Sequence, residues 1–197
     1  MKLETTPKHS SASNPAERAS QAVEEQARTI RADCQLRFGS GETFGADKPI
    51  RAWLLRHAGW QISRYKQKGN GMTAHKQAYG KHYTHEVVSF AEVVLVRVPK
   101  PTHRALQGGK RCHKGDAVFI KGVWVGRSET SDEHIALTLG GRVFSRTIRR
   151  LEPSRRHDVG FLDKVMGSPW DAQDGIARGR PRKEPAPPPP VLVGENT

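Results

Sequence analysis

The sequence has 197 residues, 35% of them apolar, with 19 glycines and 13 prolines, so it fits one ordinary domain or two small ones with unburied flanks. Its two cysteines are too few for a disulfide framework, and it lacks both a hydrophobic signal core and the ~20-residue apolar run of a membrane span. We therefore expect an intracellular protein that is neither secreted nor membrane-inserted, and its net charge of +13 favours a polyanionic partner, most commonly nucleic acid.

The first predicted element is a helix from Pro15 to about Phe38. Small or apolar residues recur there every three or four positions, which is typical of one helix face. Asn14 can cap the helix and Pro15 suits its first position. The preceding residues 1–13 are polar, and we expect them to form a flexible N-terminus.

A second helix is predicted from about Pro49 to Tyr65, where apolar positions again fall on one broad face. We expect its tryptophans, Trp53 and Trp60, to pack in the core, although stacking on nucleic-acid bases is the alternative. The segment MTAHKQAYG that follows predicts one short helical turn.

From residue 87 the pattern changes to the β-branched and aromatic residues that favour strands. Gly140-Gly141 between two such runs is a strong hairpin signal, whereas Gly122 allows either one strand or a broken pair. Four or five short strands joined by turns are typical of a small antiparallel β-barrel. The expected strand segments are residues 87–98, 117–126, 134–139 and 142–148.

After about Trp170 the chain turns polar, and residues 178–190 are basic and proline-rich. Such a composition favours polyproline conformations over a packed core. We therefore expect a mostly disordered tail within residues 157–197.

Several apparent site motifs do not have the spacing that their chemistry needs. The segment GGKRCHKGD lacks the spacing of a phosphate-binding loop, and His85-Glu86 lacks the second histidine of a metalloprotease helix. Cys112 and His113 are adjacent rather than spaced as zinc ligands. We expect all three to be ordinary loop features.

Glu17 is the first residue with two competing interpretations. It occupies the third position of the first helix, where capping and the helix dipole favour an acid by ~0.5–1 kcal/mol. On spacing alone it is therefore more readily a helix-start residue than a catalytic carboxylate.

Positive charge is distributed unevenly. Residues 1–47 carry six Lys or Arg and seven Asp or Glu, whereas the remainder carries 27 and 13. No acid lies between Asp47 and Glu86, a stretch that includes Lys66 and Lys68. A one-sign field attracts polyanions. General solubility, or contact with acidic membranes, is the alternative explanation.

A second basic cluster falls on and after the predicted hairpin, with Glu152 as its sole acid. Arginines on a small β-barrel suit phosphate contacts that position nucleic acid without reading its sequence. A solvated strand face is the alternative for any one of them. The cluster comprises Arg142, Arg146, Arg149, Arg150, Arg155 and Arg156.

Five short motifs, in order, carry a resemblance to a known family. Over roughly residues 5–155 the chain resembles the C-terminal part of integrases from copia-type LTR retrotransposon Pol polyproteins, including a β-rich segment at residues 121–151. The matching motifs are Asn14-Pro15-Ala16-Glu17-Arg18; Arg28-Thr29; Trp53, His57, Ala58 and Arg64, with Ser63 for the usual Asn; Gly71-Met72-Thr73; and Phe90-Ala91-Glu92-Val93.

The resemblance implies an α+β fold. Residues 14–85 would be the C-terminal helical part of an RNase H-like catalytic core, and residues 86–156 a small SH3-like, DNA-binding antiparallel β-barrel. Glu17 would be the third member of an Asp-Asp-Glu set. Such a set holds two Mg²⁺ ions about 3.5–4 Å apart for DNA strand transfer, because Mg²⁺ prefers carboxylate oxygens.

The departures from the family pattern limit the expected activity. Only sixteen residues precede Glu17, and none is Asp, so Glu17 could bind metal only if an upstream Asp-Asp pair were supplied. Pro15 replaces the family's Gly, and the Asn-to-Glu spacing is one residue shorter. We therefore expect the chain alone to bind no Mg²⁺ and to be catalytically incomplete.

Three functional hypotheses follow. The first is an integrase fragment, from a family that performs DNA integration, which retains nucleic-acid binding and contacts other integrase or Pol segments in the nucleus. The second is a stand-alone basic nucleic-acid-binding module derived from a retroelement. The third, which the ordered motifs disfavour, is an unrelated scaffold whose Pro-rich tail binds protein partners.

Overall fold

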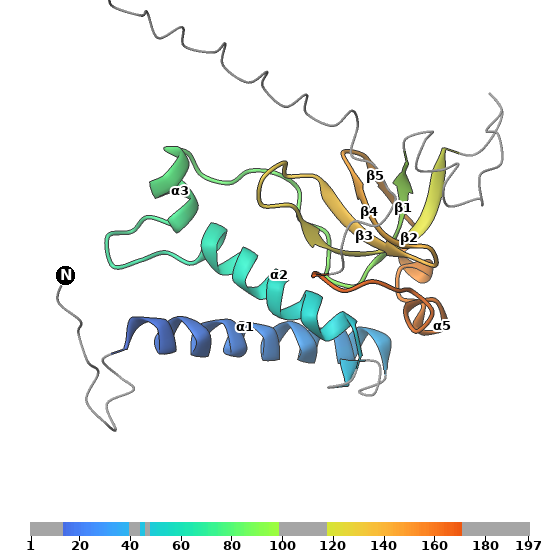
Figure 1. The fold of residues 1–197 in the computed structure, drawn as a ribbon, viewed down its shortest axis with the longest axis horizontal. Helices are drawn as coiled ribbons and strands as arrows, with labels where there is room; N and C mark the ends of the chain where they lie inside the picture. Colours follow the sequence, from blue (N-terminus) through green and yellow to red (C-terminus); the bar gives the residue numbers. More distant parts are fainter. Residues whose placement is uncertain (1–13, 40–43, 46–47, 99–117, 171–197) are drawn as a thin grey trace, which may run out of the picture.

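The computed structural model describes residues 14–39, 44–45, 48–98 and 118–170 (Figure 1). The Cys112-His113 pair, residues 1–13 and the Pro-rich segment 178–190 lie outside the described residues. The helices are α1 (Pro15–Phe38), α2 (Ile50–Tyr65), α3 (Ala74–Tyr79) and α5 (Val159–Leu162), with a 3-10 turn at Pro153–Arg155. The strands are β1 (Val93–Arg97), β2 (Phe119–Arg127), β3 (His134–Thr138), β4 (Gly141–Ser145) and β5 (Ile148–Arg150).

Helix α1 has the bounds expected from its sequence. The side chain of Asn14 accepts a hydrogen bond from the backbone amide of Ala16 at 3.0 Å, which satisfies one of the unpaired donors at the helix start. Gly39 ends the helix in the left-handed conformation, with φ of 67°. A single face is buried, through Ala27, Ile30, Cys34 and Phe38.

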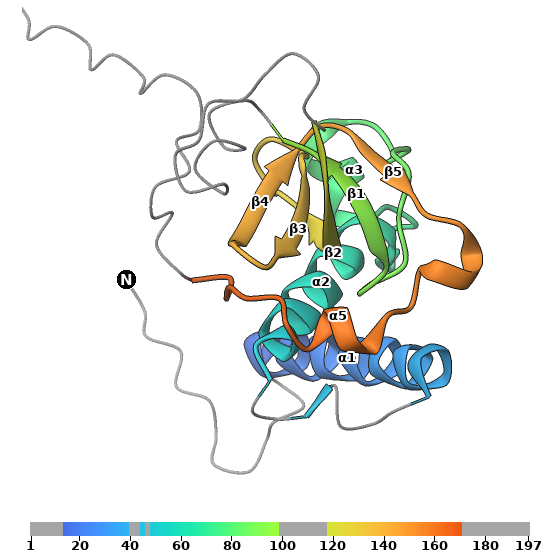
Figure 2. The same ribbon diagram turned by 90° about the vertical axis from the view of Figure 1, so that its right-hand side faces the viewer.

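Helix α2 lies between α1 and the sheet, so it is buried on more than one side (Figures 1 and 2). Trp53 and Trp60 are both buried, as expected for core residues. The short helix α3 begins at Thr73, whose hydroxyl accepts from the amide of Lys76 at 3.1 Å, and ends at Gly80 with φ of 73°. Both expected helices and the short turn are therefore confirmed.

The five strands form one antiparallel sheet in the order β4-β3-β2-β1-β5. The hairpin predicted at Gly140-Gly141 joins β3 to β4, with Thr138 opposite Gly141. The sheet is not closed into a barrel, so the expected barrel is corrected to an open sheet. β5 has only three residues, and all of them pair with β1. It forms one edge of the sheet, and β4 forms the opposite edge.

The open sheet is nevertheless strongly curled. Only Arg146 and Thr147 separate β4 from β5, although these strands lie at opposite edges. The Ser145 hydroxyl at the end of β4 donates to the carbonyl of Arg97 at 2.6 Å, and the Arg97 amide donates to Thr147 at 3.0 Å. These bonds bring the end of β4 against β1.

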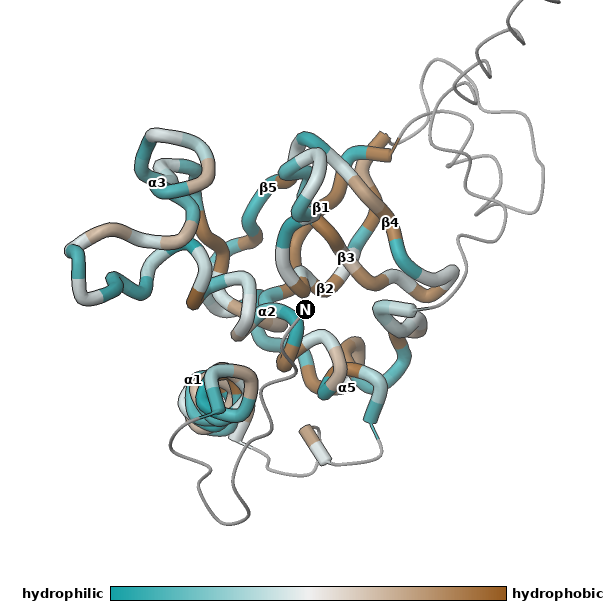
Figure 3. The backbone as a smooth tube through the Cα atoms, turned by 60° about the vertical axis from the view of Figure 1, so that its left-hand side comes forward, coloured by the Kyte–Doolittle hydropathy of each residue, from teal (hydrophilic) through white to brown (hydrophobic). Residues whose placement is uncertain are grey.

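Each face of the sheet has its own apolar core. One face packs on the helices through residues such as Trp53, Phe90, Val93 and Leu137. The other face encloses a second cluster. Figure 3 shows β1 as largely hydrophobic, whereas β5 and α1 are largely hydrophilic. The enclosed residues are Val88, Val94, Val96, Val98, Trp124, Ala136 and Val143.

One strand prediction needs correction, and one open choice is settled. β1 begins at Val93 rather than near residue 87, because Ala91 takes a left-handed conformation with φ of 65° and turns the chain. Of the two possibilities that the sequence left open at Gly122, the single strand is confirmed, because β2 runs through this glycine. A Cβ on Gly122 would lie 3.2 Å from side-chain atoms of Ala136 and Val96, so this glycine permits close packing inside the curl.

Residues 157–170, which fell within the tail expected from the sequence, include α5. Leu162 of α5 is buried in the core shared by the helices and the sheet. The indole of Trp53 donates to the carbonyl of Gly167 at 2.8 Å. This segment therefore belongs to the folded unit, together with the elements of residues 14–85 and 86–156.

Candidate nucleic-acid interface

Glu17 lies on the exposed first turn of α1, and Asn14 rather than Glu17 makes the capping bond. Within the described part of the chain, no group of three His, Cys, Asp or Glu side chains is placed to hold a metal ion. The Mg²⁺ site implied by the resemblance thus stays a prediction, and Glu17 is here an acid at the positive end of a helix dipole.

Two of the six predicted arginines contact a buried acid. Glu92 is 1% exposed and accepts two hydrogen bonds from Arg150, at 2.8 Å from Nε and 2.7 Å from Nη2. The Nε of Arg156 lies 3.5 Å from the same carboxylate and donates to the carbonyl of Leu151 at 2.7 Å. Hydrogen bonding to Glu92 raises the pKa of Arg150. These two guanidinium groups therefore stabilise the fold.

Arg142 also has internal partners. Its guanidinium donates to the carbonyl of Pro169 at 2.8 Å and lies 5.8 Å and 5.4 Å from the ring centroids of Trp53 and Phe144. The side chain thereby fastens the segment after α5 to the sheet.

The other three predicted arginines are exposed but separated. Arg146 lies on the corner between β4 and β5, 3.6 Å from Glu133, with a side chain 89% exposed. Arg149 lies on β5, and Arg155 lies in the 3-10 turn. Of these three, Arg149 is the one that strand pairing places next to further cations.

Strand register assembles a basic patch around Arg149. Leu95 of β1 lies opposite both Lys121 of β2 and Arg149 of β5, so the three side chains share one face of the sheet. Two residues further along β1, Arg97 lies opposite Phe119 on that same face. We call these five residues, Leu95, Arg97, Phe119, Lys121 and Arg149, the basic sheet face.

The basic sheet face is the uncovered end of the helix-bearing face. Along β1 and β2, Val93 and Val123 of this face are buried in the core that the sheet shares with the helices, whereas Arg97, Lys121 and Arg149 are exposed. Every second residue of a strand lies on the same face of the sheet. On this face, the residues near the helices are therefore apolar and buried, and those beyond the helices are cationic and exposed.

Aromatic rings hold two of these cations in place. The guanidinium of Arg149 lies 4.6 Å from the ring centroid of Phe119, and the ammonium of Lys121 lies 4.3 Å from that of Phe161. Lys121 also pairs with Asp158 at 2.7 Å, which holds the pKa of that carboxyl below its ordinary value. The surface therefore presents partly ordered donors rather than freely rotating side chains.

A groove of about 480 Å³ continues from this face. Leu95 and Lys121 line one part of it, and Ser154 and Arg155 line another. Arg155 is therefore the second of the predicted arginines that belongs to this surface. Asp158, already paired with Lys121, is the acid in the lining.

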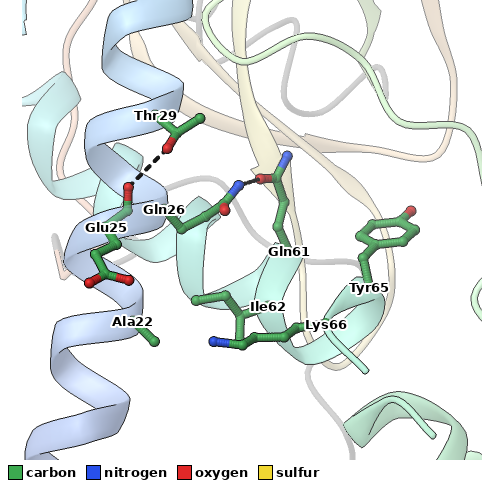
Figure 4. Close-up of a pocket in the computed structure, with 8 residues that line it drawn as sticks. All are labelled: Ala22, Glu25, Gln26, Thr29, Gln61, Ile62, Tyr65 and Lys66. Carbon is green, nitrogen blue, oxygen red and sulfur yellow. Dashed lines mark hydrogen bonds between the residues drawn. The ribbon is translucent and has the colours of Figure 1, made fainter. Parts of the chain in front are cut away.

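Lys66 and Lys68 lie elsewhere, at and beyond the end of α2. Lys68 donates to Gln77 at 2.8 Å. Lys66 lines a groove of about 550 Å³ between α1 and α2, which is crossed by a 2.8 Å hydrogen bond between Gln26 and Gln61 (Figure 4). Glu25 lies on the α1 wall of this groove, so its charge is mixed.

The sequence did not predict Arg97 and Lys121 as site residues, because each is an isolated cation in an apolar run. Strand alternation would have placed both on one face, but only the pairing of β1 with β2 and β5 joins them to Arg149. Of the helices that the structure describes, none combines the length and apolar composition of a membrane-spanning segment.

In comparisons with known proteins, no family model, curated protein or solved structure matches the chain.

Proposed function

We propose that this chain binds nucleic acid through phosphate contacts on the basic sheet face, and that it derives from a retroelement integrase. The observation that carries the proposal is the strand register that sets Arg97, Lys121 and Arg149 on one exposed surface next to Arg155. Guanidinium and ammonium groups gathered on one surface can bind phosphates without reading bases.

Two features of the fold support the retroelement origin. The five strands follow the order β4-β3-β2-β1-β5 and enclose an apolar cluster, an arrangement that suits a partly open SH3-like module. The helices α1 and α2 pack against each other, as the last helices of an RNase H-like core would. The motif residues His57 and Glu92 are both buried. A stand-alone nucleic-acid-binding module of the same origin would use the same surface.

The affinity for duplex DNA should fall steeply with salt. With four phosphate-contacting cations, counterion release predicts roughly a 100-fold loss of affinity between about 50 and about 200 mM salt. Fluorescence anisotropy across a salt series measures this slope. An affinity unchanged over that range would contradict a phosphate-dominated interface.

Arg97→Ser and Arg149→Ser should each reduce the steepness of the salt dependence by about one unit, and the double variant by about two. Arg18→Ser is the matched control, because Arg18 is an exposed arginine on the first turn of α1, on a different element. Equal effects of all three single variants would indicate non-specific charge rather than this surface.

The purified 197-residue chain should show no Mg²⁺-dependent strand transfer. The family chemistry needs three carboxylates on two metal ions, and the sequence before Glu17 contains no aspartate. Incubation with Mg²⁺ and a labelled DNA end, with Glu17→Gln in parallel, measures this. Product formation that Glu17→Gln abolishes would show that the site is complete after all.

A further inference from the structure

A third concave site lies between α3 and the loop that joins β2 to β3, and none of its residues belongs to the basic sheet face. Its volume is about 190 Å³. His75, Tyr79, Lys81 and Tyr83 line one wall, and Thr130 and Asp132 lie across from them. We call it the Tyr79 cleft.

The walls of the Tyr79 cleft are held by tertiary contacts. The Tyr83 hydroxyl donates to Asp132 at 2.8 Å, and the Tyr83 ring lies 5.3 Å from that of Trp60 and 5.3 Å from that of His75. Nδ1 of His75 lies 3.1 Å from the carbonyl of Lys81, which fastens the chain back onto α3. The cleft is therefore a fixed surface between two elements.

Tyr79 is the residue of this wall whose side chain is largely unburied. Its side chain is 65% exposed, and its ring lies 4.8 Å from that of His75 in a tilted arrangement. His75 thus packs against the Tyr79 ring, and most of the Tyr79 side chain stays exposed at the rim of a concave site. Exposed rings of this kind stack on bases whatever their sequence.

Cations accompany the aromatic rings. The guanidinium of Arg64 lies 4.7 Å from the ring centroid of Trp60 and 5.4 Å from that of Tyr83, and Lys81 is exposed nearby in the lining. Two acids line the cleft, Asp132 and Glu129. Asp132 accepts from Tyr83 and pairs with Arg127 at 3.1 Å, so its charge is compensated, and Arg64 and Lys81 outnumber Glu129, the other acid in the lining. The cleft can therefore accept an aromatic ring linked to an anion.

The size of the cleft suits one small ring. Benzene enters engineered protein cavities of about 150 Å³, whereas drug-sized ligands occupy about 300–1,000 Å³. A volume of about 190 Å³ thus accommodates a single base rather than a stacked pair. A base in a duplex is stacked on both faces and cannot enter.

We propose that the Tyr79 cleft binds one unpaired nucleotide of a nucleic-acid strand, with the base on the exposed ring of Tyr79 and its phosphate near Arg64 and Lys81. This inference rests on the proposed function, because the basic sheet face would hold the flanking strand or duplex. It adds a preference for single-stranded segments that phosphate contacts alone do not give.

The test compares a single-stranded oligothymidine with a blunt duplex of the same length, by fluorescence anisotropy at one salt concentration. Tyr79→Ala should weaken single-strand binding roughly fivefold to 100-fold, the range for loss of one base–aromatic stack. Duplex binding should stay unchanged. Tyr79→Phe keeps the ring and should retain single-strand affinity, which controls for folding.

The outcomes separate this inference from the proposed function. If the wild type binds the duplex but Tyr79→Ala leaves single-strand binding intact, or weakens both ligands equally, the cleft proposal is wrong and the basic sheet face stands. If Arg97→Ser with Arg149→Ser weakens neither ligand, the proposed function fails, whatever Tyr79→Ala does.

Discussion

Glu92→Gln should destabilise this protein more than any other single charge-neutralising substitution described above, lowering the free energy of unfolding by about 1.5–3 kcal/mol. Glu92 is 1% exposed, and its carboxylate faces Arg150 and Arg156 together. The neutral amide of glutamine no longer compensates the two guanidinium groups, which then repel each other and lose their charge-assisted hydrogen bonds. Urea unfolding followed by tryptophan fluorescence measures the loss.

The backbone explains why this acid is buried. Ala91 turns the chain with φ of 65°, its amide donates to the carbonyl of Trp124 at 2.9 Å, and the amide of Trp124 donates to the carbonyl of Glu92 at 2.8 Å. Glu92 is thereby fixed at the start of β1, next to Val94, which lies opposite Arg150. A buried acid at this point ties β5 to the turn before β1.

A double-mutant cycle separates the Glu92–Arg150 pair from the rest. Arg150→Met alone leaves Arg156 to compensate Glu92. Because Glu92 and Arg150 interact directly, the double variant Glu92→Gln/Arg150→Met should lose less free energy of unfolding than the two single variants together, by at least ~1 kcal/mol. Glu133→Gln is the matched control. Its carboxylate, 23% exposed, lies 3.6 Å from the exposed Arg146, and we expect a loss of less than about 1 kcal/mol. Similar losses for Glu92→Gln and Glu133→Gln would contradict a stabilising buried cluster.

Local signals in the sequence predicted the helices and the hairpin, because the interactions that define them are local. Asn14 and Gly39 mark the two ends of α1, and Gly140-Gly141 marks the turn between β3 and β4. Gly122 was ambiguous for the opposite reason. Its role depends on Val96 and Ala136, which lie on neighbouring strands.

The candidate site was only partly predictable, because its charges are sorted by long-range pairing. Arg149 and Arg150 are adjacent in sequence, but alternation along β5 sends Arg149 to the exposed face beside Leu95 and Arg150 to the side of Glu92. Net charge cannot distinguish a cation that faces solvent from one that compensates a buried acid. The sheet register makes that distinction.

Acid should destabilise the fold between about pH 6.5 and pH 4, because two buried histidines resist protonation. Burial lowers the pKa of His57 to about 4, with a smaller contribution from nearby Arg56. Burial also lowers the pKa of His134 to about 4, with Arg127 adding to the effect and Asp132 opposing it. Nδ1 of His134 accepts from the indole of Trp124 at 3.1 Å, which requires this nitrogen to be unprotonated.

Stability falls on acidification because the two histidines have lower pKa values in the folded state than in the unfolded state. The unfolded chain takes up these protons near pH 6.5 and the folded chain only near pH 4, so the free energy of unfolding falls as the pH is lowered through that window. Each histidine contributes up to about 3 kcal/mol. Below pH 4 both states are protonated, and these two residues add no further loss.

His57→Phe should remove about half of this pH dependence. The His57 ring stacks 5.5 Å from Trp60 and 5.3 Å from Phe90, and neither of its nitrogens has a hydrogen-bond partner in the described part of the chain, so phenylalanine keeps the stack without a proton site. His82→Phe, at an exposed position, is the control and should leave the pH profile unchanged. Urea unfolding at pH 7 and pH 4.5 measures both variants. If His57→Phe loses as much stability on acidification as the wild type, His57 is not a source of the acid sensitivity, and the protons must enter elsewhere in the fold.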